Sequence, residues 1–266
     1  MRWRLWRRAV AGLFAVLLVT LTARPALAAQ SVCRSVDTDS MQIALTFDDG
    51  PHPTLTRRIL DILDRYGVKA TFFMVGVNVE RYPDAARAVL TAGHEVGNHT
   101  YSHRAMDRLS QDAIEVELGG CEDALEELCE YRPHLFRPPQ GAINPLVEAE
   151  ASHNDYSLIL WSLDTRDWEN KNTDEIVERV LSTVTAGDII LMHDYIGHGS
   201  RTPEALELLL PALLERGFKP VTVSELTASA GRQCLHPLIA VCAAKTCFFI
   251  SRFRTAQDMH NKYETK

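Results

Sequence analysis

Short apolar runs alternate with amphipathic stretches along this chain from Met41 to about Leu226. Such alternation is typical of β/α units, in which helices cover a sheet of parallel strands. Seven runs separated by helices fit a barrel better than an open sheet, so we predict an α/β fold, a (β/α) barrel of about seven parallel strands in a single domain. The candidate strands are Ile43–Phe47, Ala70–Val75, His94–Asn98, Leu135–Arg137, Ser157–Leu163, Asp188–His193 and Lys219–Val223.

Three of the intervening stretches have helical spacing and residues that favour helix ends. One helix is predicted over Thr54–Tyr66 and ends at Gly67, and another over Pro203–Arg216 ends at Gly217. Glycine is common at the position that follows a helix, where the backbone turns left-handed. A third helix is predicted over Ser110–Leu128, with serine as its N-cap.

The first 28 residues have the features of an export signal rather than of a folded element. Four arginines among the first eight residues precede the apolar run Val10–Leu21, and the small residues of Ala26–Ala28 form a cleavage site. The run is short for a membrane span. We therefore expect cleavage, a secreted or cell-surface location and no integral membrane segment afterwards; a retained N-terminal anchor is the alternative.

The pattern divides the chain into an export signal (1–28), a lead-in (29–40), the β/α domain (41–226) and a C-terminal tail (227–266) that has no clear period. The tail has no functional interpretation.

The whole chain has a formal charge of −7, and the signal holds five Arg and no acid, so the mature chain would carry −7 − 5 = −12. Such acidity argues against nucleic acid as a partner.

Six cysteines fit an exported chain, in which disulfides can persist. Cys33 and Cys234 flank the predicted domain, and we expect them to pair. Cys121 and Cys129 lie eight residues apart in a predicted helix, which would hold their Cα atoms about 12 Å apart. Because that separation exceeds disulfide reach, either the helix ends before Cys129 or these two cysteines do not pair.

Polar side chains follow five of the candidate strands at the point where each strand ends. In a β/α barrel the carboxyl ends of all strands meet at one rim, where active sites are built. We therefore expect these residues to converge, and Asn98 to line the same site. They are Asp48, Asp49, His99, Arg137, Asp164, Asp167 and His193.

His99 and His103 are four residues apart, so on a helical turn both imidazoles would project from one face. Adding one aspartate gives a set of two histidines and one carboxylate, which typically holds a catalytic metal with open positions for water. A cation would also explain the adjacent carboxylates of Asp48 and Asp49, which repel one another without a positive partner. One aspartate would bind the metal and leave the other free to act as a base.

Five short motifs occur in an order that resembles the polysaccharide deacetylases, the NodB-homology domain of carbohydrate esterase family 4. The resemblance runs over Met41–Leu226 and implies a distorted (β/α) barrel and metal-assisted removal of acetyl groups from a polysaccharide. The motifs are "TFDDG" (Thr46–Gly50), "HTYSH" (His99–His103), "RPPQG" (Arg137–Gly141), "DTRDW" (Asp164–Trp168) and "LMH" (Leu191–His193).

The resemblance implies a role for each matching residue. Asp48 would be the catalytic base, and Asp49, His99 and His103 would bind a divalent metal. Zinc is the expected metal and cobalt is the alternative.

The remaining motifs imply the acid and the substrate pocket. His193 would be the acid, Asp167 would hold it with Asp164 as a second candidate, and Arg137 would position the base. Gln140 stands where the family commonly has tyrosine, so substrate specificity is where we expect this chain to differ; its backbone N–H would help to stabilise the oxyanion. The residues expected at the pocket are Pro138, Pro139, Gln140, Trp168 and Leu191.

The expected function is an exported, metal-dependent deacetylase that hydrolyses N-acetyl groups of a GlcNAc-containing polymer, of peptidoglycan or chitin type. An O-acetyl esterase acting on xylan-type polysaccharide is one alternative, because the same tetrahedral chemistry serves both. A catalytically silent carbohydrate-binding module is another. The presence of Asp48, Arg137 and His193 argues against silence, since binding alone requires none of them.

Overall fold

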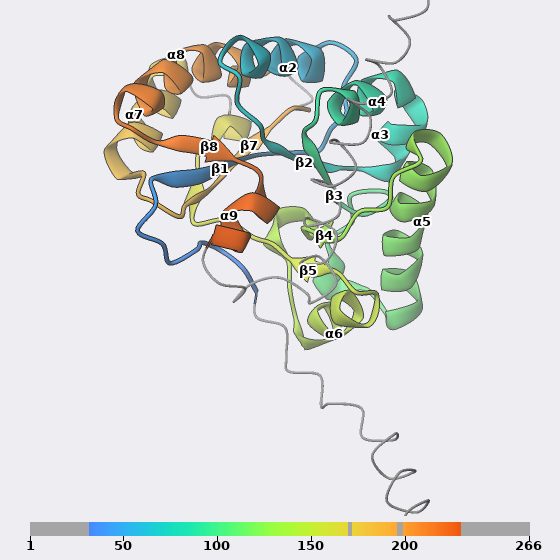
Figure 1. Ribbon diagram of the computed structural model, residues 1–266. Coiled ribbons are helices and arrows are strands. Elements are labelled where there is room, and N and C mark those ends of the chain that lie inside the picture. The colour runs from blue at the N-terminus through green and yellow to red at the C-terminus, as the bar shows by residue number, and fades with distance from the viewer. Residues whose placement is uncertain (1–31, 170–171, 196–198, 230–266) are drawn as a thin grey trace, which may run out of the picture. The chain divides into compact units, whose positions relative to one another are not determined.

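The computed structural model describes residues 32–169, 172–195 and 199–229. An eight-stranded sheet lies at its centre in the order β5-β4-β3-β2-β1-β7-β6, with β8 also paired to β1, and helices cover its outside (Figure 1). Every strand pairing is parallel. The strands are β1 (Gln42–Asp48), β2 (Thr71–Met74), β3 (Glu95–Asn98), β4 (Leu135–Phe136), β5 (Ser157–Leu158), β6 (Leu163–Asp164), β7 (Ile189–His193) and β8 (Lys219–Val221).

Each of the seven predicted runs contains a strand, and the distorted (β/α) barrel is confirmed. The eighth strand arises because the run Ser157–Leu163 forms two short strands, β5 and β6, rather than one. These two stand at opposite ends of the strand order, so the barrel is open between them. The carbonyls of Ile159 and Leu160 in the break instead accept hydrogen bonds from the Arg137 guanidinium, at 3.3 and 3.0 Å.

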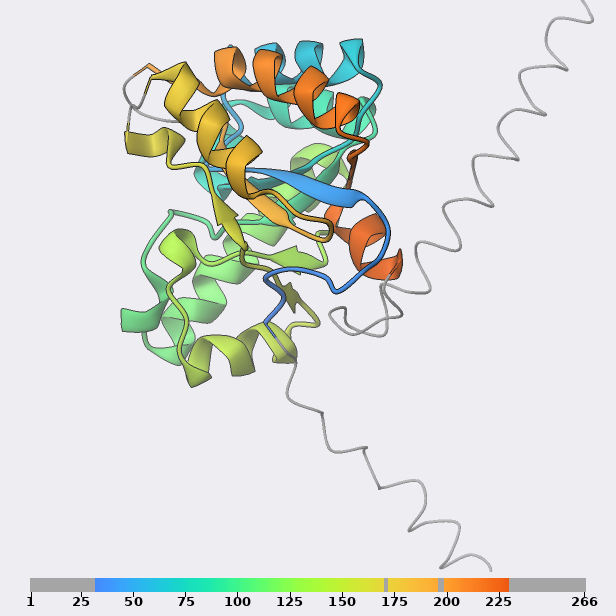
Figure 2. The same ribbon diagram turned by 90° about the vertical axis from the view of Figure 1, so that its left-hand side faces the viewer.

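The lead-in lies across this opening. The Cys33 amide donates to the Leu158 carbonyl at 2.9 Å, and the Val36 amide donates to the Gly187 carbonyl at 2.9 Å, so the lead-in bridges the two arms of the sheet. The segment that precedes β1, blue in Figure 2, passes beside the yellow-green part of the chain. Gly187 has a φ of +84°, and a Cβ there would lie 1.8 Å from the Val36 oxygen. Only glycine fits this crossing.

The helices agree with the three predictions within one or two residues at each end. Gly67 and Gly217 have φ of +63° and +86°, as expected after helix ends. Ser110 precedes α5 as predicted, but its side chain makes no capping hydrogen bond. The α-helices are α2 (Leu55–Arg65), α3 (Gly76–Arg81), α4 (Pro83–Thr91), α5 (Gln111–Cys129), α6 (Pro145–His153), α7 (Thr173–Thr183), α8 (Thr202–Glu215) and α9 (Val223–Ser229), and the short 3₁₀ helices are η1 (Met106–Arg108), η2 (Pro139–Gly141) and η3 (Asp167–Glu169).

Side-chain alternation along β1 separates the core from the site. Ile43, Leu45 and Phe47 belong to the large apolar cluster that includes residues of α2 and α8. Thr46 and Asp48, which point to the other face, are also buried and contact the Arg137 side chain. Because strand residues alternate between faces, one face of β1 packs against helices while the other carries polar groups into the barrel.

Several predictions fall on parts of the chain that the structure does not describe. The export signal, Cys234 and the tail beyond Ser229 lie outside the described residues, and α9 runs three residues past the expected start of the tail. Cys121 and Cys129 lie on the continuous helix α5 and are not paired with one another, as their spacing requires. Within the described part of the chain, no helix combines the length and apolar character that a membrane span needs.

Candidate active site

Most of the residues predicted at strand ends converge at one rim of the barrel. Asp48 ends β1 in register with His193 at the end of neighbouring β7. His99 follows β3, and Arg137 follows β4, which pairs with β3. Side chains from four strands are therefore brought together by the parallel pairing of the sheet.

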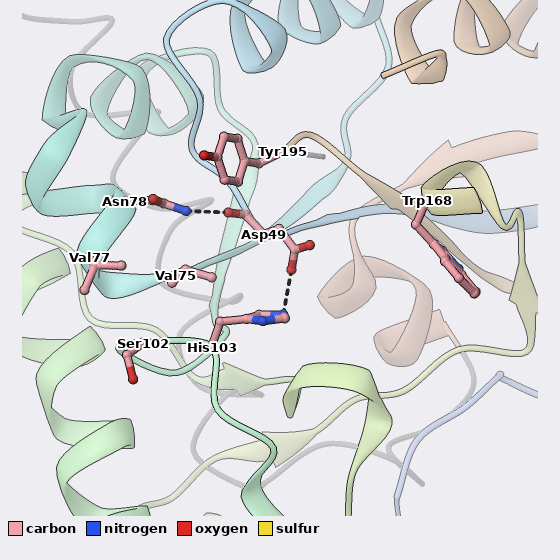
Figure 3. Close-up of a pocket in the computed structure, with 8 residues that line it drawn as sticks. All are labelled: Asp49, Val75, Val77, Asn78, Ser102, His103, Trp168 and Tyr195. Atoms are coloured by element: carbon pink, nitrogen blue, oxygen red, sulfur yellow. Dashed lines mark hydrogen bonds and ion pairs between the residues drawn. The ribbon is translucent and has the colours of Figure 1, made fainter. Parts of the chain in front are cut away.

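Asp49, His99 and His103 form a cluster that suits a divalent metal. The Asp49 Oδ1 lies 2.9 Å from His103 Nε2 and 3.3 Å from His99 Nε2, and one potential ligand atom from each residue lies within 4.8 Å of the others. Figure 3 shows the Asp49 carboxylate directed at His103. His99 Nδ1 donates to the Arg137 carbonyl at 2.6 Å, so in the neutral imidazole Nε2 would carry the lone pair that a metal ligand needs.

The electrostatics of this cluster match a cation site. Burial acts to raise the pKa of Asp49, but its hydrogen bonds with His103 and His99 outweigh burial and hold that pKa well below the usual range. The hydrogen bond with Asp49 raises the pKa of His103 against the effect of burial. An anionic oxygen therefore faces two imidazoles, which is a donor set that zinc and cobalt accept.

The two histidines do not converge through a helical turn, and that prediction is wrong. Residues 99–103 form an irregular loop, in which Thr100 and His103 have φ of +69° and +59°. Asp49 also has a positive φ, +76°, so the alternation of strand faces ends at Asp48. This turn lets the neighbours Asp48 and Asp49 both approach His99, at 3.8 and 3.3 Å.

The Asp48 carboxylate is held by a buried arginine. Its Oδ1 accepts a hydrogen bond from Arg137 Nη1 at 2.7 Å, and the same nitrogen donates to Thr46 Oγ1 at 2.8 Å. Arg137 is fully buried, and its guanidinium lies 4.1 Å from the centre of the Phe73 ring. Asp48 is therefore an oriented carboxylate beside the candidate metal ligands.

His193 is paired with Asp167, the first of the two aspartates considered for this contact. Its Nδ1 lies 2.7 Å from Asp167 Oδ1, and its backbone amide donates to Asp167 Oδ2 at 2.8 Å. Thr202 donates to the same Oδ2 at 2.6 Å. Asp164 instead accepts the amide of Arg166. Burial acts to lower the pKa of His193, but the hydrogen bond and charge of Asp167 prevail and raise it to about 9, so this imidazole is protonated at neutral pH.

A groove with a volume of about 380 Å³ opens beside the cluster (Figure 3). Trp168 lines it and is 49% exposed. The other residues expected at the pocket are not among those that line this groove: three of them are buried, and Gln140 is exposed with a φ of +60°. The lining residues are Asp49, Val75, Val77, Asn78, Ser102, His103, Trp168 and Tyr195.

Three further residues support the site and were not predicted. The Asn78 side chain donates to the Asp49 carbonyl at 2.8 Å, and Tyr195 lines the groove. Asp194 is buried, accepts a hydrogen bond from Thr56 Oγ1 at 2.5 Å, and leaves no room for a Cβ on Gly50, which would lie 2.2 Å from the carboxylate. Gly50 was part of a recognised motif, but nothing in that motif indicates what packs against it.

Asn98 does not line the groove, but it contacts the loop that carries the histidines. Its Oδ1 accepts the Thr100 amide at 2.8 Å, and its Nδ2 donates to the Leu118 carbonyl at 2.9 Å. His52, which follows the aspartate pair, uses Nδ1 to accept the amides of Thr54 and Leu55 at the start of α2. Both residues therefore have structural contacts.

Comparison with known proteins agrees with this arrangement. The family model described as polysaccharide deacetylase matches residues 35–159. The chain is 43% identical over 186 residues to a peptidoglycan-N-acetylglucosamine deacetylase of Bacillus cereus, an alignment that covers 69% of this chain and 87% of the relative.

Two solved structures illustrate the range of the similarity. An acetyl xylan esterase of family 4 from Clostridium thermocellum, in complex with a cobalt ion, is 36% identical with a TM-score of 0.65 and covers 70% of this chain and 90% of that one. A family 4 pseudoenzyme from Bacillus anthracis is 30% identical with a TM-score of 0.71 and covers 76% and 70%. The strand-end cluster, the barrel and these similarities together lead to one conclusion: the chain belongs to the polysaccharide deacetylase family of hydrolases.

Proposed function

We propose that this protein is an exported, metal-dependent deacetylase that hydrolyses N-acetyl groups on a GlcNAc-containing polymer, with peptidoglycan as the favoured substrate. The observation that carries the proposal is the meeting, at one rim, of a two-histidine, one-aspartate cluster with the pairs Asp48–Arg137 and His193–Asp167. The 43% identity to a peptidoglycan-N-acetylglucosamine deacetylase supports the choice of polymer.

Asp49, His99 and His103 would hold the metal, with zinc favoured and cobalt as the alternative. A divalent ion bound there would polarise the acetyl carbonyl and lower the pKa of a bound water. Two imidazoles and one carboxylate leave positions open for water and substrate, which is typical of catalytic rather than structural sites.

The protein's own groups would carry the protons. Asp48, oriented by Arg137 at 2.7 Å, would accept a proton from the water that attacks the acetyl carbon. His193, held by Asp167, would donate its proton to the sugar nitrogen as the C–N bond breaks. The products are acetate and a free amine, and a backbone N–H near Gln140 would stabilise the oxyanion that precedes them.

Two alternatives remain distinct from this proposal. The similarity to an acetyl xylan esterase favours O-acetyl hydrolysis as a second activity of the same site. The similarity to a pseudoenzyme means that this fold alone does not guarantee catalysis. The complete set of Asp48, Arg137 and His193 supports an active enzyme, because a binding module has no use for a base and an acid.

Acetate release from a panel of substrates tests the proposal. The metal-free protein, and the same protein reloaded with Zn²⁺ or Co²⁺, would be incubated with N-acetylated peptidoglycan, chitooligosaccharides and acetylxylan. We expect acetate from peptidoglycan only after metal is restored. Release from acetylxylan alone would establish the esterase instead. Binding of polymer without acetate release by the metal-loaded protein would establish the silent module.

A further inference from the structure

The loop that carries both candidate metal-binding histidines is held in a backbone conformation that its residues disfavour. Thr100 and His103 have φ of +69° and +59°, and neither is glycine. Left-handed conformations of such residues persist only where the surroundings fix them. Within the loop the Thr100 hydroxyl accepts the His103 amide at 3.1 Å, and groups outside the loop fix the residues between them, on which the direction of His103 depends.

Part of the support comes from the N-terminus of α3 and from β3. The Gly76 amide donates to the Thr100 carbonyl at 3.0 Å, and the Val77 amide donates to the Tyr101 carbonyl at 2.9 Å. Asn98 accepts the Thr100 amide at 2.8 Å. These contacts fix the first half of the loop, but none of them reaches Ser102, the residue directly before His103.

Glu117, in the middle of α5, supplies the contacts to the second half. Its carboxylate accepts two hydrogen bonds from Ser102, one from the amide at 2.8 Å and one from the hydroxyl at 2.5 Å. Its carbonyl accepts the Tyr101 amide at 2.8 Å. The side chain is buried, at 4% exposure, and the Arg104 guanidinium lies 4.0 Å from the carboxylate.

A buried carboxylate is well suited to this task. Hydrogen bonds to an ionised acceptor are shorter and stronger than neutral ones, and they gain further where water is excluded. A carboxylate also offers two oxygens of the same kind, so it can accept both Ser102 donors at once. A glutamine could accept the Ser102 amide through its one oxygen, but its NH₂ group would have to donate to the Ser102 hydroxyl, so the hydroxyl bond would reverse and both bonds would lose their ionised acceptor.

We infer that Glu117 is a positioning residue for the metal site: through Ser102 it holds the second half of the 99–103 loop so that His103 faces Asp49 beside His99. The inference rests on the metal dependence proposed above. Glu117 lies outside all five motifs, and its hydrogen bonds go to Ser102 and Tyr101 rather than to a ligand. Its effect on the metal is indirect.

The test measures metal affinity rather than activity alone. Variants Glu117→Gln and Ser102→Ala, and the double variant, would be compared with wild type by competition for Zn²⁺ against a chromophoric chelator and by the visible absorption of the Co²⁺-loaded protein. Loss of a group that supports metal ligands from outside typically weakens binding by about 10–100-fold. We expect a loss of this size in each single variant and a changed Co²⁺ spectrum.

The double variant and a matched control separate positioning from general damage. Because both substitutions disrupt the same contact, the double variant should bind metal no more weakly than the worse single variant. Glu115→Gln makes the same replacement of a carboxylate by an amide, but at an exposed position of α5. It should leave both the Zn²⁺ affinity and the Co²⁺ spectrum at wild-type values. The activity deficit of Glu117→Gln should also shrink as Zn²⁺ is raised, which a purely structural defect would not do.

Wild-type Zn²⁺ affinity and an unchanged Co²⁺ spectrum in Glu117→Gln would overturn the inference while leaving the proposed function intact. If Glu117→Gln fails to fold, Ser102→Ala carries the same decision, since it removes only a hydroxyl. A wild-type protein that binds neither ion would remove the proposed function and, with it, this inference.

Discussion

Asp48 and Asp49 are adjacent in the chain but have different partners, and this separates their expected roles. Asp48 Oδ1 contacts Arg137 at 2.7 Å, whereas Asp49 Oδ1 contacts His103 at 2.9 Å. Asp48→Asn should remove the proton acceptor and leave all three proposed ligands, so metal content should persist while kcat falls by on the order of 10²–10⁴. Asp49→Asn should instead lower metal content, because a neutral amide replaces an anionic ligand.

Metal analysis of the two purified variants, alongside acetate release, decides between these roles. Thermal unfolding of both metal-free variants serves as the control, since Asp48→Asn also alters a buried ion pair. Loss of metal in Asp48→Asn with retention in Asp49→Asn would reverse the assignment.

The pairing of His193 with Asp167 leads to a pH prediction. The carboxylate raises the pKa of His193 to about 9, and the imidazole must be protonated to act as an acid. The rate constant kcat/KM should therefore fall as pH rises through about 9. In Asp167→Asn the hydrogen bond to a carboxylate and the charge of Asp167 are lost, while burial still lowers the pKa of His193, so this alkaline limb should move to lower pH.

Asp164→Asn is the matched control for that measurement. Asp164 accepts the Arg166 amide, whereas His193 is held by Asp167, so loss of the Asp164 carboxylate should leave the alkaline limb of the pH–rate profile where it is in wild type. An alkaline limb that stays in place in Asp167→Asn, or moves only in Asp164→Asn, would contradict the assignment of Asp167 as the partner of His193.

The motif residues were predictable from sequence, but the residues that support them were not. Asp49, His99 and His103 could be proposed together because two histidines and a carboxylate are a donor set typical of metal sites and because their motifs resemble those of the family. Glu117 was indistinguishable from the other acids of an acidic helix, and Asp194 contacts Thr56 from 138 positions away. A single sequence carries no signal for contacts of that kind.

At the scale of elements, Arg137 explains why one predicted strand became two. The run Ser157–Leu163 is mostly apolar, so its composition predicts a single strand. The break occurs where the Ile159 and Leu160 carbonyls accept hydrogen bonds from the Arg137 guanidinium. This is a tertiary contact, and it overrides the local preference of the sequence.

Removal of Arg137 should therefore destabilise the fold as well as the site. Arg137→Ala leaves the buried Asp48 carboxylate without its partner, and breaking a buried ion pair in this way costs about 3–5 kcal/mol. Arg132, whose side chain is 64% exposed beside Glu122, is the matched control: Arg132→Ala should cost about 0–1 kcal/mol. The free energy of unfolding by denaturant measures both, and equal losses in the two variants would contradict the structural role of Arg137.

The lead-in crossing provides a second test at this scale. Gly187 and Gly217 have nearly equal φ, +84° and +86°, but a Cβ would lie 1.8 Å from the Val36 oxygen at Gly187 and meet nothing within 4 Å at Gly217. Gly217→Ala should cost about 1–2 kcal/mol through backbone strain alone. Gly187→Ala should cost clearly more, because the lead-in must also move. Equal free energies of unfolding for the two variants would mean that the lead-in does not pack against Gly187.

At the scale of the whole molecule, fold and activity were predictable to different degrees. The alternation of strands and helices predicts the barrel because every β/α unit repeats the same pattern. It does not predict catalysis, since a pseudoenzyme shares this architecture with a TM-score of 0.71. A few side chains at one rim support activity, and the groove beside them is lined by residues such as Trp168 and Tyr195, which no residue code translates into a sugar.

The proposed substrate is an extracellular polymer, and the protein can reach it only if the chain is exported. Export is therefore a prediction on which the proposed function depends. Four arginines followed by the apolar run Val10–Leu21 and a small-residue site at Ala26–Ala28 predict cleavage after Ala28. The mature N-terminus should lie near Ala29, which leaves Cys33 and the lead-in in the mature protein to bridge the sheet. Intact mass and N-terminal sequencing of protein from the medium and from the membrane fraction would measure this.

A substitution of Ala28 by a bulky residue, Ala28→Trp, should block processing and retain the chain at the membrane, whereas Ala9→Trp outside the cleavage site should not. A wild-type chain found only in the membrane fraction with its first arginines attached would establish an N-terminal anchor in place of a cleaved signal.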